Sequence, residues 1–364
     1  MKIYIKKLKE ALEHPIIFLP IILLILAFGG LFYFGEITEV LSKKGFYSFE
    51  INSGEGGAGN ILNEPHPLTG KRCGNSEKRP FAVMMPSDQI TRPLSGIAKA
   101  DLVVEMPVTQ PGQGGINRMM AVFACEEPEE IGSVRSARDD FIPLAASFDA
   151  IYAHWGGSHF ALDELKKGII PDIDALVNPF STYYRKQWIA RPHNGFTSFN
   201  RLLNTSEKLG FRTENKFGGY PHIEGSSSVG DNPTTISVAY PGSYRVSYVY
   251  NPENNSYMRW RGGSPEVDAL DNKQVESKIL IVMKTNTRHL EGQYNDVDVF
   301  GSGQAYVFQN GELIRASWQK EYGDIDGKLY FYNKKDKEIK FVAGNMWIHV
   351  VDNSTPIYWG GERL

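Results

Sequence analysis

The sequence has little cysteine, no excess of either charge and no complete catalytic signature. Its 39 lysines and arginines against 42 aspartates and glutamates give a formal net charge of −3. Such a balanced chain lacks the broad basic surface that binds nucleic acid, so no nucleic-acid partner is expected. No serine stands in a Gly-x-Ser-x-Gly elbow, and Gly301-Ser302-Gly303 lacks the strand-to-helix context of a nucleotide fingerprint. We therefore expect no cofactor and no metal.

One long apolar run lies near the amino terminus, at residues 15–35, and it contains no charged residue. At about 1.5 Å per residue it matches the roughly 30 Å hydrocarbon core of a bilayer. The preceding tail, residues 1–14, carries four lysines, and this bias keeps the amino terminus in the cytoplasm. We predict a single-pass anchor in the cell membrane with the globular part outside the cytoplasm. A cleaved signal peptide is the alternative.

The two cysteines, Cys73 and Cys125, would lie in a compartment where a disulfide persists. Cys125 also ends an apolar run, so a buried free thiol is an equal alternative. Cys73 is the first cysteine and follows the apolar run at a distance, which excludes lipid attachment at the end of that run.

Composition divides the rest of the chain into a linker and two domains. Residues 36–66 contain the run Asn52–Asn60 (NSGEGGAGN), rich in glycine and asparagine, followed by Pro65, which favours a flexible linker. In residues 67–222 short apolar segments alternate with helical candidates at 137–148, 158–167 and 198–209, which predicts a layered α/β (α+β) sandwich.

Residues 234–353 contain short strand candidates joined by turn dipeptides, which predicts a smaller, mostly-β domain. Asn310-Gly311, between two alternating apolar segments, is typical of a type I′ hairpin. The tyrosines and tryptophans of these strands offer a carbohydrate-binding surface or, alternatively, cross-strand packing. These residues are Tyr244, Tyr248, Tyr250, Tyr257, Trp260 and Trp318.

Six motifs carry a family resemblance. They are Pro67–Gly70 (PLTG), Arg79–Met84 (RPFAVM), Arg92–Gly96 (RPLSG), Ala100–Glu105 (ADLVVE), Ile131–Arg138 (IGSVRSAR) and His154–Ser158 (HWGGS). In this order they resemble the YerB-like family of bacterial lipoproteins, and Gly344–Ile348 (GNMWI) resembles its carboxy-terminal part. The resemblance implies an α/β sandwich domain followed by a strand-rich domain, displayed outside bacterial cells, without an established activity or catalytic residue. The predicted transmembrane anchor departs from the lipoprotein members.

Arg135 and Arg138 dominate the densest polar segment of the first domain. Ser136 is a candidate helix cap with Asp139 three residues later, so both guanidiniums would lie beside free backbone N–H groups. That arrangement would suit a phosphate or carboxylate ligand. In the alternative, the two arginines pair with Asp139, Asp140 or Asp101 and only fix the loop.

The second candidate is the turn from His154 to Ser158, where a predicted strand meets a helix capped by Ser158. Gly156 and Gly157 would let a ligand approach the backbone, and Trp155 offers a face for a sugar. His154 is the candidate acid or base, although a buried, hydrogen-bonded histidine in a tight turn is the alternative.

Two functional hypotheses follow. The first is an envelope protein that binds or scaffolds a cell-wall glycan, an anionic polymer or a protein partner through Arg135, Arg138, Asp139 and the His154–Ser158 turn. The second is a hydrolase or transferase acting on a cell-envelope polymer, which requires the two loops to converge on one cleft with perturbed titratable groups.

Overall fold

The computed structural model describes residues 65–110, 115–227 and 234–364. The predicted tail, the predicted anchor at 15–35 and all but the last two residues of the predicted linker lie outside the described residues. Within those three ranges, no helix is long and apolar enough to cross a bilayer.

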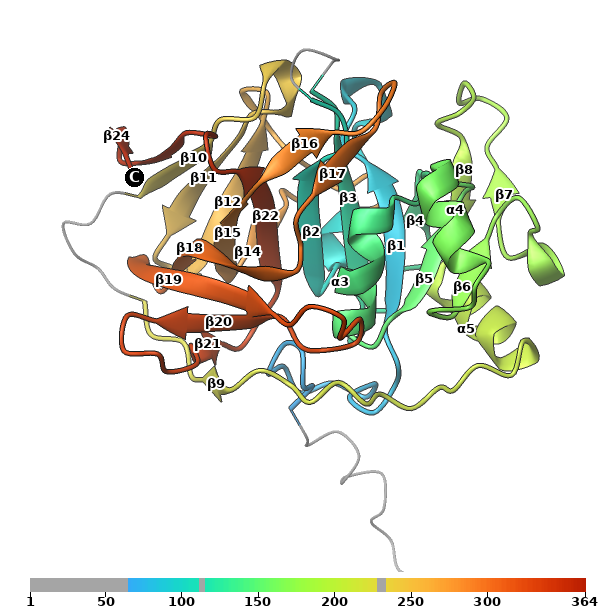
Figure 1. Ribbon diagram of the computed structural model, residues 1–364, viewed down its shortest axis with the longest axis horizontal. Coiled ribbons are helices and arrows are strands. Elements are labelled where there is room, and N and C mark those ends of the chain that lie inside the picture. The colour runs from blue at the N-terminus through green and yellow to red at the C-terminus, as the bar shows by residue number, and fades with distance from the viewer. Residues whose placement is uncertain (1–64, 111–114, 228–233) are drawn as a thin grey trace, which may run out of the picture. The chain divides into compact units, whose positions relative to one another are not determined.

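A ten-stranded mixed sheet forms the centre of the fold, in the order β20-β19-β18-β15-β22-β2-β3-β1-β5-β6 (Figure 1). Five of its strands come from the first predicted domain: β1 (Phe81–Pro86), β2 (Leu102–Pro107), β3 (Asn117–Phe123), β5 (Ile151–His154) and β6 (Asp172–Asp174). The other five come from the second: β15 (Ile279–Thr285), β18 (Gly301–Gln309), β19 (Glu312–Lys320), β20 (Tyr330–Asn333) and β22 (Met346–Asp352).

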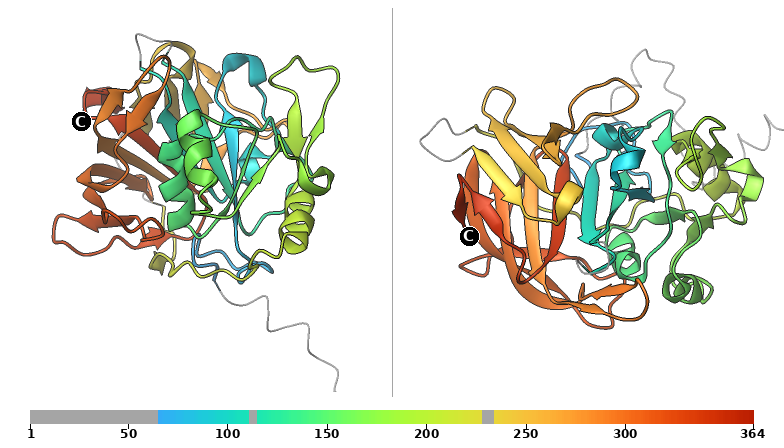
Figure 2. Two further views of the ribbon diagram at one scale, coloured as in Figure 1. Left: turned by 45° about the vertical axis from the view of Figure 1, so that its right-hand side comes forward. Right: turned by 90° about the horizontal axis from the view of Figure 1, so that it is seen from above.

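The two sequence regions meet inside this sheet. Strand β2 pairs in parallel with β22, and Leu102 lies opposite Met346. Figure 2 shows the red and orange strands of the carboxy-terminal region continuing into the blue and cyan strands of the amino-terminal region. The apolar pattern predicts both strands, but their pairing depends on residues far apart in the sequence.

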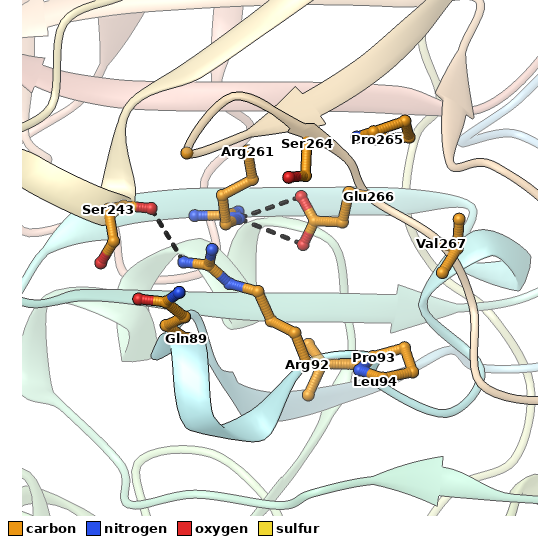
Figure 3. Close-up of a pocket in the computed structure, with 11 residues that line it drawn as sticks. Gln89, Arg92, Pro93, Leu94, Ser243, Arg261, Ser264, Pro265, Glu266 and Val267 are labelled. Atoms are coloured by element: carbon orange, nitrogen blue, oxygen red, sulfur yellow. Dashed lines mark hydrogen bonds and ion pairs between the residues drawn. The ribbon is translucent and has the colours of Figure 1, made fainter.

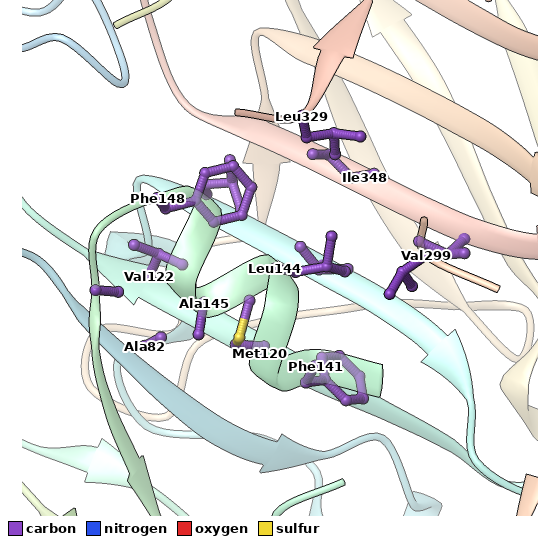
Figure 4. Close-up of a cluster of buried hydrophobic side chains, with 14 of the residues drawn as sticks. Ala82, Met120, Val122, Phe141, Leu144, Ala145, Phe148, Val299, Leu329 and Ile348 are labelled. Carbon is purple, nitrogen blue, oxygen red and sulfur yellow. The ribbon is translucent and has the colours of Figure 1, made fainter. Parts of the chain in front are cut away.

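Alternating side chains bury both faces of the sheet. In β1, Ala82 and Met84 face one core, whereas Phe81, Val83 and Met85 face the other. The first core contains helix α3 (Ile142–Ser147) and part of helix α4 (His159–Leu165), and Figure 4 shows α3 packed on the strands. Helix α5 (Phe199–Lys208) and a second sheet cover the other face.

The second sheet has seven strands: β10 (Thr235–Val238), β11 (Val246–Asn251), β12 (Ser256–Arg261), β13 (Ser264–Pro265), β14 (Glu276–Ser277), β23 (Ile357–Trp359) and β24 (Glu362–Arg363). Three small sheets complete the described part: β4 (Ile131–Gly132), β8 (Gly195–Thr197) and β7 (Tyr184–Arg185); β9 (His222–Ile223) and β21 (Phe341–Val342); β16 (Thr287–His289) and β17 (Asn295–Val297). The α+β class is therefore confirmed.

Local predictions fared differently. The Asn310-Gly311 hairpin is confirmed, because both residues have positive φ (56° and 74°) and join β18 to β19. The predicted helix at 137–148 is instead a 3-10 turn, η4 (Asp139–Phe141), followed by the short α3 with Pro143 in its first turn. The prediction that Ser136 caps a helix is wrong, since Arg138 occupies the position before η4 and no side chain caps it.

The two cysteines form a disulfide. Cys73 and Cys125 have their Cα atoms 5.6 Å apart and are bonded through sulfur. The free-thiol alternative is therefore wrong. A structural disulfide is typical of proteins that fold in an oxidising compartment.

Candidate functional site

The strand directions bring several loops to one edge of the central sheet. Strands β1 and β5 are parallel, β22 is parallel to both β2 and β15, and β3 runs antiparallel to β1 and β2. The amino end of β3 therefore lies at the same edge of the sheet as the carboxyl ends of five strands, namely β1, β2, β5, β15 and β22. Ligands commonly bind outside the carboxyl ends of parallel strands.

Three arginines gather at this edge, and we call Arg118, Arg135 and Arg138 the edge arginines. Arg118 is the second residue of β3, next to Asn117. The segment with the other two runs between the ends of β1 and β5, because Arg135 N donates to Met84 O (2.8 Å) and Trp155 N donates to Arg135 O (3.0 Å).

The edge arginines are close enough to repel one another. Burial, together with the charges of Arg118 and Arg138, lowers the pKa of Arg135 to about 10. Burial and the charge of Arg118 also lower the pKa of Arg138. One carboxylate compensates them directly: Asp88 forms an ion pair with Arg118 at 3.0 Å and accepts a hydrogen bond from the Tyr244 hydroxyl at 2.8 Å.

Hydrogen bonding leaves the edge arginines incompletely satisfied. Among the described residues, Nε of Arg118 and Nε of Arg138 are buried without a hydrogen-bond partner. Arg138 donates through Nη1 to Ala137 O at 2.9 Å, and its guanidinium lies 5.7 Å from the ring centre of Tyr294. Buried polar groups of this kind are normally paired, so these two guanidiniums are less completely hydrogen-bonded than is usual.

The carboxylates that could have neutralised these arginines have other partners. Asp139 accepts a hydrogen bond from Ser158 Oγ at 3.3 Å, and Asp140 accepts one from Val297 N at 3.1 Å. Asp101 forms an ion pair with Lys71 at 3.0 Å. The alternative in which Arg135 and Arg138 pair with these carboxylates is therefore not what the structure shows.

His193 adds a neutral contact to Arg135. The two side chains meet at 3.0 Å, between Arg135 Nη1 and His193 Nδ1. Burial and the charge of Arg135 lower the pKa of His193, so its neutral ring accepts the hydrogen bond near pH 7.

The His154–Ser158 turn is joined to the arginine segment by backbone hydrogen bonds. Ala137 N donates to Gly156 O at 2.8 Å, and Ser158 N donates to Ala137 O at 3.1 Å. Ser158 caps α4 as predicted, because its hydroxyl accepts from Ala161 N. Gly157 fits tightly, since a Cβ there would lie 3.1 Å from that of Ala137. The two predicted loops thus converge.

His154 itself is held inside this turn. Its side chain is fully buried, Nδ1 lies 2.9 Å from Gly156 O, and Nε2 lies 3.1 Å from Asp172 Oδ2. Gly156 has a φ of +60°, which suits glycine, and its N–H donates to Asp174. This arrangement corresponds to the buried, hydrogen-bonded alternative for His154.

Trp155 also has neighbours on its ring. The guanidinium of Arg185 lies 4.1 Å from the ring centre, and a Cβ on Gly195 would lie 2.3 Å from ring atoms. The ring is thus packed closely by the protein, which leaves little of it for a sugar.

A pocket of about 310 Å3 lies beside the edge, between the loop after β1 and the β12–β13 hairpin (Figure 3). Arg92 donates through Nη2 to the carbonyls of Ser87 (2.8 Å) and Ser243 (2.9 Å), and its buried Nε has no partner among the described residues. Tyr244 lies within electrostatic range of both Arg92 and Arg118, which places the pocket next to the edge arginines.

Sequence reasoning missed a buried ionic network, two members of which, Arg261 and Glu266, form part of the wall of this pocket. Glu105 of β2 pairs with Arg259 (2.6 Å) and Arg261 (2.7 Å) of β12, and Glu266 pairs with both arginines. Burial alone would raise the pKa of Glu105, but Arg261 and Arg259 lower it below its ordinary value. A charged residue within the apolar strand Leu102–Pro107 was the available signal.

The carbohydrate-binding alternative does not hold for four of the six aromatic residues of the second region. Tyr248, Tyr250, Tyr257 and Trp318 are at most 6% exposed, so they pack in the cores, in line with the packing alternative.

The family comparisons agree with this architecture. Models described as "Protein of unknown function (DUF3048) N-terminal domain" and "Protein of unknown function (DUF3048) C-terminal domain" match residues 68–212 and 236–348. The chain is 28% identical over 293 residues to "Putative lipoprotein YerB" of Bacillus subtilis (strain 168), covering 78% of this chain and 85% of that protein. It also matches the crystal structure of the YerB protein from Bacillus subtilis with a TM-score of 0.71 and 27% identity, over 80% of this chain and 98% of that one. The chain belongs to the YerB-like family, a two-domain family of unknown function.

Proposed function

We propose that this protein binds an anionic polymer or glycan of the cell envelope through the edge arginines. The observation that carries the proposal is the pair of buried, unpartnered Nε atoms on Arg118 and Arg138, with Asp88 as the directly paired carboxylate. Guanidiniums recognise phosphates and carboxylates through paired N–H donors. A phosphate or carboxylate on the ligand would accept hydrogen bonds from the half-buried guanidiniums of Arg135 and Arg138 and relieve the repulsion among the three cations.

The envelope location has independent support. The Bacillus subtilis relative is named "Putative lipoprotein YerB", and the Cys73–Cys125 disulfide favours an oxidising compartment. Because both cysteines of this chain are bonded to each other, neither can carry a lipid. We propose that residues 15–35 provide the membrane tether, with the amino terminus in the cytoplasm.

A hydrolase or transferase acting on the same polymer is the competing function. His154 was its predicted acid or base, but both ring nitrogens are bonded within the protein and the side chain has no exposed surface. A general acid or base must reach the proton that it transfers. The buried histidine therefore supports binding over catalysis.

The test is co-sedimentation of the full-length chain, in detergent, with purified cell-wall material. Wild type is compared with Arg135→Ala/Arg138→Ala, while the supernatant is assayed for released fragments. A charge-assisted hydrogen bond contributes about 1.5–3 kcal/mol, so losing each arginine should weaken binding roughly ten- to hundredfold.

Arg315→Ala/Arg363→Ala is the matched control, because it removes two exposed arginines and changes the net charge equally. Retained binding by this control with loss in the edge variant supports the proposal. Equal loss in both would reduce the effect to general electrostatics and contradict it. Released fragments would establish the enzyme, and no binding with no release would point to a protein partner.

A further inference from the structure

One short stretch of the chain exposes several large apolar side chains. Four of the nine exposed large hydrophobic residues in the described part lie between positions 176 and 188. They are Leu176 (66% exposed), Val177 (77%), Phe180 (57%) and Trp188 (80%). We call these four residues the apolar patch. Soluble surfaces seldom concentrate such side chains unless they meet another apolar phase.

The patch lies in an unbroken run without negative charge. Residues 175–206 contain no aspartate or glutamate, whereas Arg185, Lys186, Arg191 and Arg201 are cationic. Lys208 lies 5.2 Å from the ring centre of Phe180. Lys186 lies 5.9 Å from that of Trp188 but is paired with Glu130 at 2.5 Å. The exposed cations Arg191, Arg201 and Lys208 thus accompany the patch, and they make its surroundings complementary to a negatively charged surface.

Hydrogen bonds hold the loop that carries Phe180. Tyr183 N donates to Asn178 Oδ1 at 2.8 Å, and Arg201 Nη1 donates to Ser181 O at 2.8 Å. Phe180 has a φ of +52°, which a bulky residue rarely adopts, so these contacts hold it in a strained, outward-facing conformation. Strained backbone of this kind clusters at functional positions.

The patch lies at one end of the described part of the chain. Its residues occupy the connections that follow β6, which is the edge strand of the ten-stranded sheet. Figure 1 shows β6, β7, β8 and α5 together at the right-hand end, away from β18 to β20. This end can therefore meet a flat surface without involving the carboxy-terminal strands.

We infer that the apolar patch and its flanking cations dock this end of the molecule onto an anionic lipid surface. Tryptophan, phenylalanine and leucine beside lysine and arginine are typical of segments that enter the interface of a bilayer with anionic headgroups. A polyanion alone would use the cations but would leave the four apolar side chains in water. The lipid surface uses both features, and this inference is independent of the edge arginines.

The distribution of tryptophan makes the inference directly measurable. None of the six tryptophans lies in residues 15–35, and Trp188 is the tryptophan among the exposed large hydrophobics. The full-length chain is reconstituted into vesicles of phosphatidylcholine, with or without phosphatidylglycerol, whose acyl chains are brominated. We expect tryptophan quenching in the phosphatidylglycerol vesicles and little in phosphatidylcholine alone. Trp188→Tyr should remove the quenched component.

A matched variant separates docking from exposure. Trp188→Tyr/Tyr322→Trp moves the indole to position 322 in the second region, where the native tyrosine is 74% exposed. The relocated indole should not be quenched. Arg191→Glu/Lys208→Glu should lose most of the wild-type quenching, whereas the exposed pair Lys334→Glu/Lys335→Glu should retain it. Quenching of the relocated indole equal to that of Trp188 in wild type would overturn the inference. An absence of tryptophan quenching in wild type would also overturn it. That result would be expected if the patch binds a protein or a wall polymer instead.

Discussion

Two groups of arginines in this protein differ in how their charge is balanced. Arg259 and Arg261 share Glu105 and Glu266 in ion pairs of 2.6–3.0 Å, and all four side chains are at least nine-tenths buried. Of the edge arginines, Arg118 is paired directly with a carboxylate, Asp88, and Nε of both Arg118 and Arg138 has no hydrogen-bond partner among the described residues.

The contrast separates a structural role from a binding role. In a low dielectric an unpaired cation is unfavourable, and partners in the protein normally compensate it. The network of Glu105 is complete, so it needs no ligand and instead joins the central sheet to the second sheet. The edge arginines lack that compensation, which an anionic ligand would provide.

The largest expected effect is the loss of stability when the complete network is broken. Glu105→Gln leaves Arg259 and Arg261 short of one buried negative charge, and breaking a buried ion pair costs about 3–5 kcal/mol. Urea denaturation of the full-length chain in detergent measures the loss. The exposed pair of Glu291 with His159 provides the control, since Glu291→Gln should change stability by less than about 0.5 kcal/mol. A Glu105 effect as small as the control would refute the structural role.

A second prediction concerns pH and the histidine of the same network. Burial lowers the pKa of His349 from 6.5 to about 3. Between these values the unfolded chain binds a proton that the folded chain excludes, so stability falls as pH decreases through this window. His349→Asn should remove this contribution to the pH dependence. As pH decreases, the unfolding free energy of the variant should therefore rise relative to that of wild type, by at most about 1.4 kcal/mol per pH unit. Parallel stability curves for the two proteins would rule out the assignment.

The smallest effect on stability is expected at the edge. Arg135→Met/Arg138→Met removes cations that repel each other and keeps much of their packing volume. We expect the unfolding free energy to change by less than about 1 kcal/mol, or to increase. Denaturation under the same conditions as for Glu105→Gln compares the two groups directly. Destabilisation as large as that of Glu105→Gln would mean that the edge arginines are structural.

The sequence allowed the strands and the loops of this comparison to be predicted, but not their partners. A continuous apolar run located β1, and Arg135 and Arg138 were found because they crowd one polar segment. Arg118 was missed because it directly precedes the apolar run of β3 and shows no pattern of its own. The pairing of β2 with β22 was also missed, because local periodicity holds no information on which distant strand is the neighbour.

One local error has a simple cause. Ser136 has the spacing of a capping residue, but the chain stays extended through Arg138, and the backbone of Ala137 pairs with the His154–Ser158 turn. For His154 the sequence left two alternatives, an acid or base and a buried, hydrogen-bonded side chain. Its burial between Gly156 and Asp172 depends on tertiary contacts that the local sequence does not contain.

The central claim is that the edge arginines, unlike the buried network, are completed by an anion. Its most direct test is to measure the thermal stability of the full-length chain in inorganic polyphosphate and to compare it with the stability in sodium chloride of equal ionic strength. A ligand at 100 times its Kd stabilises by about 2.7 kcal/mol. We predict that polyphosphate stabilises wild type and the Arg315→Ala/Arg363→Ala control, but not Arg135→Met/Arg138→Met. Equal stabilisation of all three proteins would contradict the claim.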